Sequence, residues 1–213
     1  MKTIWLSNEI SISDELRQLI PDLKRDFLNY HTDYFTTFSK SQSYKNSTFN
    51  TNNVMSTKDA WRTEGIRYSL PDHKILIDLF TYPLINNKFP TASSLVRKYY
   101  NHCNCASYNS LEPNSHILRH SDIENRERKF IRIHVPLIIP EGDTFFEVAD
   151  EEVKWDDIFG FDNASFHSAY NNTNQRRLIF LIDLSREFLG ISPEIPFDKN
   201  LTKTMPKFIR KQN

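Results

Sequence analysis

Residues 129–139, KFIRIHVPLII, form an apolar run that two polar side chains interrupt. Arg132 and His134 are two positions apart, so on a β-strand both point to the same face. The stretch therefore predicts a strand with an arginine and a histidine on one side. An arginine among apolar neighbours needs an anionic partner, because burying an unpaired charge is costly.

Similar short apolar segments follow one another through the C-terminal half. They are CASYNSL, SHIL, TFFEVA, DIFGF and RRLIFLIDL, and turn residues such as Glu-Pro-Asn, Pro-Glu-Gly-Asp and Asn-Asn-Thr-Asn separate them. Short strands with regular turns favour a β-sandwich or barrel-like core.

The N-terminal half contains helical patterns. Residues 13–35 carry apolar side chains at helical spacing, namely Leu16, Leu19, Ile20, Leu23, Phe27 and Leu28. We expect Ser13 to cap this helix, and Pro21 to divide it or to start a second one. Residues 91–101 predict another helix, and residues 75–80 a strand.

A length of 213 residues suits one domain, which we expect to span 1–213. Residues 1–100 would form a helical and loop layer, and within it residues 39–57, rich in Ser, Asn, Thr and Lys, predict a long loop. Residues 101–190 would form the β core, and residues 191–213 a tail.

The composition excludes some classes of partner. Lysine plus arginine numbers 27 and aspartate plus glutamate 27, so nothing calls for nucleic acid or an anionic membrane. No apolar run approaches the length of a membrane span. The two cysteines, Cys103 and Cys105, are poorly placed to bond each other, and we expect a reduced, cytoplasmic setting.

Three polar residues suggest a metal site. His120 and Asp122 form a His-x-Asp pair, and His167 follows a strand-like segment further on. Two histidines and one carboxylate with open positions suit Fe(II) and oxygen chemistry, with zinc as the second choice of metal.

A 2-oxoacid co-substrate would also need a cation, and arginine binds a carboxylate through two parallel bonds. Arg177 opens the apolar run RLIFLID, and Arg132 lies in a similar run. The alternative for Arg177 is a structural ion pair with Asp162, Asp183 or Glu187, and His134 could equally be a core histidine.

Taken together these motifs resemble a known family. HSD, RIHVPL, FDNASFH, Arg177 and Asp183 occur in the order and spacing of the aspartyl/asparaginyl β-hydroxylase family of Fe(II)/2-oxoglutarate oxygenases. The stretch from HSD to RIHVPL looks most like the bacterial proline cis-4-hydroxylase branch. The resemblance covers residues 107–184.

The resemblance implies a double-stranded β-helix, which is a cupin-like jelly roll, with Fe(II), 2-oxoglutarate and O2 as cofactors. It implies that His120, Asp122 and His167 ligate the iron. Arg177 would bind the distal carboxylate of 2-oxoglutarate, and Arg132 and His134 would contact the carboxylate nearer the metal. Some members have a serine that helps to hold the distal carboxylate, and its position corresponds to about Asn109 or Ser110 in this sequence.

The resemblance also implies a hydroxylase acting on an sp3 carbon of an amino acid, free or within a peptide. Two other functions stay open: a non-catalytic, metal-binding cupin-like sensor, and a zinc hydrolase or isomerase. Trp61, Arg62 and Arg67 could line the substrate side, although core packing for the tryptophan and solvent for the arginines are slightly favoured.

Overall fold

The computed structural model describes residues 2–29, 36–37, 61–70, 75–122, 125 and 127–192. Its helices are α1 (Ser13–Leu28), α3 (Pro83–Lys88), α4 (Pro90–Lys98) and α5 (Arg186–Leu189), with short 3-10 turns η1 (Ser7–Glu9) and η6 (Leu79–Thr81). Its strands are β1 (Ile4–Leu6), β2 (Thr36–Thr37), β3 (Trp61–Leu70), β4 (Ile75–Ile77), β5 (Cys103–Leu111), β6 (Ser115–His120), β7 (Phe130–Ile138), β8 (Thr144–Val148), β9 (Glu151–Glu152), β10 (Phe159–Phe161), β11 (His167–Asn171) and β12 (Arg177–Ser185).

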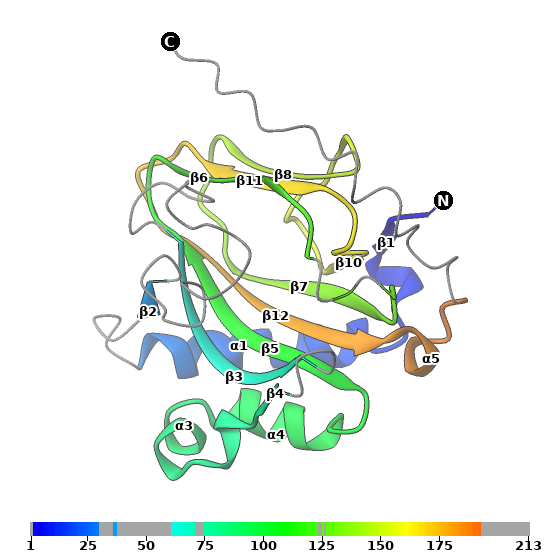
Figure 1. Ribbon diagram of the computed structural model, residues 1–213. Helices are drawn as coiled ribbons and strands as arrows, with labels where there is room; N and C mark the ends of the chain where they lie inside the picture. Colours follow the sequence, from blue (N-terminus) through cyan, green and yellow to red (C-terminus); the bar gives the residue numbers. More distant parts are fainter. Residues whose placement is uncertain are drawn as a thin grey trace.

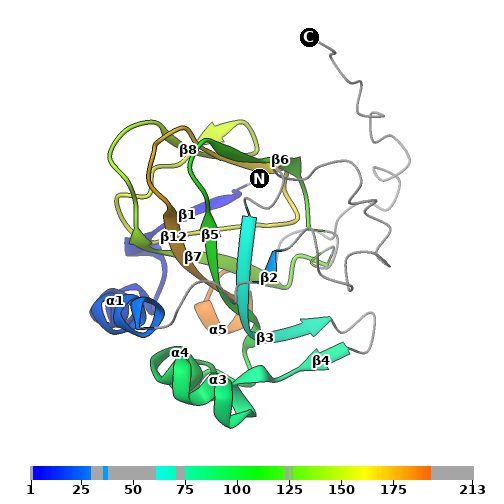
Figure 2. The ribbon, with the colours of Figure 1, turned by 90° about the vertical axis from the view of Figure 1, so that its left-hand side faces the viewer.

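Two antiparallel sheets lie face to face (Figure 1). The larger sheet has the order β1-β10-β7-β12-β5-β3-β2, with β4 paired to β3, and the smaller has the order β6-β11-β8-β9. Helices α1, α3 and α4 lie on the outer side of the larger sheet, away from the smaller one (Figures 1 and 2).

The strand connections identify the fold. From β5 to β12 the chain alternates between the sheets, with β8 and β9 adjacent in the smaller one. The pairs are nested, because β5 pairs with β12, β6 with β11, β7 with β10 and β8 with β9. A chain folded into such nested antiparallel pairs is a double-stranded β-helix, so the predicted jelly roll is confirmed.

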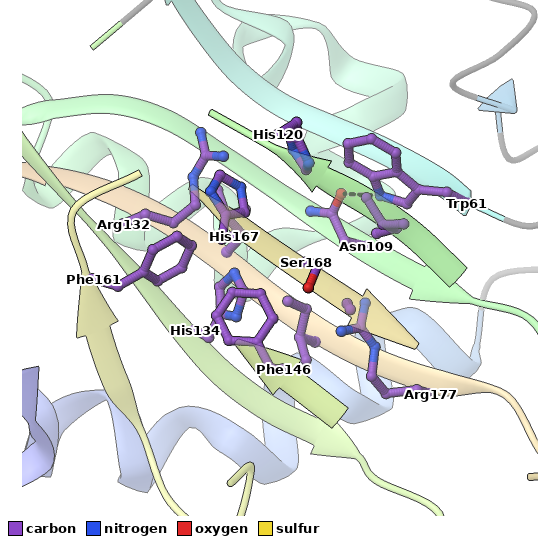
Figure 3. A pocket seen from close by; sticks show the side chains of 14 residues that line it. Trp61, Asn109, His120, Arg132, His134, Phe146, Phe161, His167, Ser168 and Arg177 are labelled. Carbon is purple, nitrogen blue, oxygen red and sulfur yellow. Dashed lines mark hydrogen bonds between the residues drawn. The ribbon is translucent and has the colours of Figure 1, made fainter. Parts of the chain in front are cut away.

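Alternation along β7 and β12 separates the core from the polar site. Ile131 and Ile133 of β7, with Phe180 of β12, pack in the core beneath the helices. Arg132 and His134 point instead toward the smaller sheet, as the two-residue strand period requires (Figure 3). The same period gives β12 an apolar outer face and an inner face with Arg177 and Asp183.

The first helix differs from its prediction in two respects. Pro21 lies inside α1, which is continuous from Ser13 to Leu28. Proline removes one backbone donor, but Pro21 is exposed, and the buried Leu16 and Leu23 on either side hold the helix against the sheet. Ser13 is not the cap, because Ile12 occupies that position and makes no side-chain capping bond.

The N-terminal hundred residues are not only helices and loops, because in the described part of this segment β1, β2, β3 and β4 extend the larger sheet. β3, which we did not predict, pairs with β5 along most of its length, and β1 pairs with β10. The predicted strand at 75–80 is shortened to β4, followed by η6, and the helix predicted at 91–101 is α4. The predicted loop at 39–57 and residues 193–213 of the tail lie outside the described residues.

In the part of the chain that the structure describes, no helix is both long and apolar enough to cross a membrane. Cys103 and Cys105 lie on β5 as buried free thiols.

We predict that Glu64 of β3 makes stability fall as the pH rises. Burial raises the pKa of this carboxyl to about 7, and Lys88 opposes the shift. The unfolded chain therefore loses this proton near pH 4.5 while the folded protein keeps it until about pH 7. Glu64→Gln should remove this penalty and stabilise the protein by roughly 1–2 kcal/mol above pH 7, after allowance for partial exposure. Urea unfolding of both proteins at about pH 4 and pH 8, on either side of the two pKa values, measures the gain in stability. An equal gain at both pH values would contradict the prediction.

Candidate metal centre and anion pocket

Two histidines face each other where two strands of the smaller sheet meet. His120 ends β6 and His167 begins β11, and the two residues are directly paired, with ring centroids 4.2 Å apart. The Nδ1 of His120 lies 2.7 Å from the Leu118 carbonyl, and that of His167 lies 2.9 Å from the Ser165 carbonyl. A carbonyl only accepts, so each Nδ1 carries the hydrogen and each Nε2 keeps its lone pair for a metal.

Asp122 follows β6 by two residues and completes the cluster. Its Oδ2 accepts hydrogen bonds from Nδ2 of Asn163, at 3.0 Å, and from Nη1 of Arg132. Its Oδ1 lies 3.7 Å from Nε2 of His120. His120, Asp122 and His167 each offer one ligand atom, and these atoms lie within 4.8 Å of one another. The donor set fits the Fe(II) site that two histidines and a carboxylate form.

The electrostatics keep Asp122 and His167 in the forms that bind a metal. Burial alone would raise the pKa of Asp122, but Arg132, with smaller contributions from the two histidines, holds it down to about 2. Burial, with a smaller contribution from the neighbouring His120, lowers the pKa of His167 to about 3. At neutral pH Asp122 is therefore ionised and His167 is neutral.

Arg132 is held by two carboxylates. It lies opposite Asp183 in the pairing of β7 with β12, and its Nε and Nη2 donate to the two oxygens of Asp183 at 2.8 and 2.9 Å. The remaining nitrogen, Nη1, donates to Asp122. Asp183 and Asp122 are thus the anionic partners that an arginine in this apolar strand needs. Arg132 also lines the pocket, and its contact with a co-substrate stays a prediction.

Arg177 lies at the opposite end of the same pocket from the two metal-site histidines (Figure 3). It is only 2% exposed, and its guanidinium stacks 4.4 Å above the ring of Trp155. Burial lowers its pKa to about 9, so it remains a cation at neutral pH. Its Nε has no hydrogen-bond partner, and among the described residues no carboxylate forms an ion pair with it.

The structural ion pairs considered for Arg177 from the sequence are therefore not found in the described part of the chain. Asp183 binds Arg132, and Asp162 binds Arg128 and Arg186. A buried cation without an anion is unfavourable, so the pocket is suited to an anionic ligand.

His134 lies between these two ends, in an aromatic wall. The rings of Phe146, Phe159 and Phe161 lie 5.0 to 5.2 Å from its own. Nε1 of Trp155 donates to its Nδ1 at 3.4 Å, which places the proton of the neutral ring on Nε2. Burial, aided by Arg177 and Arg132, lowers the pKa of His134 well below its ordinary value. His134 is thus a neutral hydrogen-bond donor.

The pocket as a whole combines apolar and aromatic side chains with a few polar groups, as sites for small molecules usually do. Its lining residues are Trp61, Asn109, Ile117, His120, Arg132, His134, Phe146, Phe161, His167, Ser168, Ala169, Arg177, Ile179 and Leu181. Of the two positions suggested for a carboxylate-binding serine, Asn109 lines the pocket and Ser110 does not. Ser168 also lines it, between His167 and Arg177 (Figure 3).

The structure differs from the predictions for the side chains of β3. Trp61 lines the pocket, and its Nε1 donates to Oδ1 of Asn109 at 3.3 Å. Arg67 is not in solvent as expected, because it is buried against Asp78 and the ring of Tyr100. Arg62 is partly buried, and its Nε lies 3.8 Å from Oε1 of Glu112.

Sequence reasoning missed several residues of the site, among them Trp155, Asn163 and Ser168. Trp155 lies between β9 and β10, outside any periodic pattern, so only the fold brings it to Arg177. Asn163 and Ser168 lie near the ends of the FDNASFH motif, next to Asp162 and His167, and this proximity was the only available indication.

Comparison with known proteins identifies the family. The sequence model of the aspartyl/asparaginyl β-hydroxylases matches residues 8–187. The chain belongs to this family. It is a hydroxylase family with Fe(II), 2-oxoglutarate and O2 as its cofactors, and its substrates are small molecules or peptides. The resemblance noted in the sequence is thereby confirmed at the level of the family. No curated protein sequence matches the chain.

The similarity of the chain to solved structures is low. An oxidoreductase of the 2OG-Fe(II) oxygenase family from Burkholderia pseudomallei is 13% identical, over 60% of this chain and 69% of its own, with a TM-score of 0.41. A predicted oxalate decarboxylase from Thermotoga maritima is 18% identical, over 42% and 73%, with a TM-score of 0.33. The KdgF protein from Halomonas sp. is 10% identical, over 62% and 86%, with a TM-score of 0.34.

We predict that His167→Ala weakens divalent-metal binding by more than the roughly 10- to 100-fold that accompanies loss of a residue supporting a ligand. The variant removes a donor outright from the three-residue cluster. Electron paramagnetic resonance of free Mn(II) during a titration measures the affinity. His116→Ala is the matched control, since His116 lies on the exposed face of β6. Equal affinities of wild type and His167→Ala would contradict the ligand assignment.

Proposed function

We propose that this protein is an Fe(II)- and 2-oxoglutarate-dependent dioxygenase that hydroxylates an sp3 carbon of an amino acid, free or within a peptide. His120, Asp122 and His167 would hold the iron, while Arg177 and His134 would bind 2-oxoglutarate. The observation that carries the proposal is the buried Arg177, without an ion pair among the described residues, in the pocket that His120 and His167 of the metal cluster also line.

The charges of the pocket support a divalent metal together with a dianion. The formal charges of Arg132, Arg177, Asp122 and Asp183 sum to zero when the histidines are neutral, although both carboxylates bind Arg132 and neither pairs with Arg177. A divalent metal alone would leave two buried positive charges, and an anionic ligand would offset them. The two carboxylates of 2-oxoglutarate supply the two negative charges.

Each protein group has a distinct task in this scheme. Arg177, held over the ring of Trp155, would bind the distal carboxylate through its planar fork. Nε2 of His134 would donate to the carboxylate nearer the metal. The aromatic wall of Phe146 and Phe161 would exclude water from the reacting groups.

When bound, Fe(II) with 2-oxoglutarate and O2 supplies the oxidising power that inserts one oxygen atom into a C–H bond, while 2-oxoglutarate leaves as succinate and CO2. The likeness of the HSD to RIHVPL stretch to proline hydroxylases favours an amino-acid substrate. The buried free thiols on β5 suit a reducing, cytoplasmic setting. A zinc hydrolase or isomerase would leave Arg177 without its anion.

The direct test is anaerobic reconstitution with Fe(II), followed by addition of 2-oxoglutarate. We expect the weak visible charge-transfer band that a 2-oxoacid gives when it chelates Fe(II). Succinate release in air would then be screened over free amino acids and short peptides. A folded, iron-loaded protein that shows no band would overturn the oxygenase proposal.

We predict that Arg177→Gln raises the apparent KM for 2-oxoglutarate by about 10- to 100-fold, since a charged hydrogen-bond pair contributes about 1.5–3 kcal/mol. The iron affinity should be unchanged, because Arg177 is not among the metal donors. Titration of the charge-transfer band gives the affinity for 2-oxoglutarate directly. The neighbouring Arg176→Gln is the matched control, because Arg176 binds Glu112 instead of lining the pocket. An unchanged affinity in Arg177→Gln would refute the assignment.

A further inference from the structure

Asp183 makes no hydrogen bond to His120, Asp122 or His167, yet it determines how Arg132 contacts Asp122. Both oxygens of Asp183 are taken up by Nε and Nη2 of Arg132, at 2.8 and 2.9 Å. This side-on pair leaves only Nη1 of the guanidinium to reach Asp122. Asp183 is 2% exposed, so its carboxylate is largely shielded from water.

The two oxygens of Asp122 are consequently in different environments. Oδ2 accepts from both Arg132 and Asn163, whereas Oδ1 faces Nε2 of His120 at 3.7 Å. Asn163 is itself oriented, because its Oδ1 accepts from Nδ2 of Asn125 at 2.6 Å and its backbone carbonyl accepts from the Asp122 amide at 2.8 Å. One oxygen is thus committed to the protein and one remains for a metal.

A guanidinium released from Asp183 would behave differently. Arginine and a carboxylate prefer two parallel hydrogen bonds, which engage both carboxylate oxygens. Arg132 without Asp183 would be able to turn its fork onto Asp122 and take Oδ1 as well as Oδ2. The cation would then compete with the metal for the same oxygen.

We infer that Asp183 is a positioning residue, which restrains Arg132 so that Oδ1 of Asp122 stays available to the metal. This inference rests on the metal site of the proposed function. It concerns the apo protein and its affinity for metal, so it is tested without turnover.

The experiment compares Mn(II) binding by wild type, Asp183→Asn and the double variant Arg132→Gln/Asp183→Asn, using the resonance of free Mn(II). We expect Asp183→Asn to raise the Kd about 10- to 100-fold, as loss of a residue that orients a metal ligand does. The double variant should bind more tightly than Asp183→Asn, because it lacks the competing guanidinium. A role in folding alone would change the melting temperature and leave the affinity of the folded protein unchanged.

Asp78→Asn is the matched control, because Asp78 pairs with the buried Arg67 and neither residue lines the pocket. It should keep the wild-type affinity for Mn(II). Where Asp183→Asn does not fold, the double variant is compared with Arg132→Gln instead. If Asp183 acts only through Arg132, these two variants should bind Mn(II) equally, and weaker binding by the double variant would overturn the inference. Wild-type affinity in a folded Asp183→Asn overturns it too, with the metal site intact. A wild-type protein that binds neither Mn(II) nor Fe(II) would overturn the proposed function itself.

Discussion

The larger sheet is covered on both faces, by helices on one side and by the smaller sheet on the other, and any charge that its central strands carry is removed from water. Such a charge must find a partner inside the protein or in a ligand. Strands β7 and β12 carry three charged groups on the inner face, namely Arg132, Asp183 and Arg177. The first two satisfy each other, and the third has no anion among the described residues.

This constraint links the metal centre to the anion pocket. Arg132 and His134 are neighbours on one face of β7, so the strand that supports Asp122 also presents a donor to the pocket. Trp155 connects the other end, since it stacks on Arg177 and donates to His134. The site is therefore preorganised by contacts among its own side chains before any ligand binds.

The β core was predictable because its strands are short apolar runs between turn residues, and every one of them from β5 to β8 and at β12 appears where the sequence indicates. β3 was not, because WRTEGIRYSL mixes charged and apolar residues without strict alternation and contains a bulge between Gly65 and Arg67. The predicted break of the first helix at Pro21 was wrong for a different reason. A proline predicts a break only when tertiary packing does not hold the helix, and α1 is fixed to the sheet by buried residues on both sides of it.

The sequence by itself determined the chemical types present and their order: two histidines and an aspartate as metal donors, and arginines in apolar strands that require anions. The tertiary structure alone decided which anion each arginine receives. Arg132 meets Asp183 across 51 positions of sequence, because β7 and β12 are hydrogen-bonded neighbours with these two residues in register. No local pattern encodes that register, and it is what leaves one oxygen of Asp122 and the guanidinium of Arg177 for ligands from outside the chain.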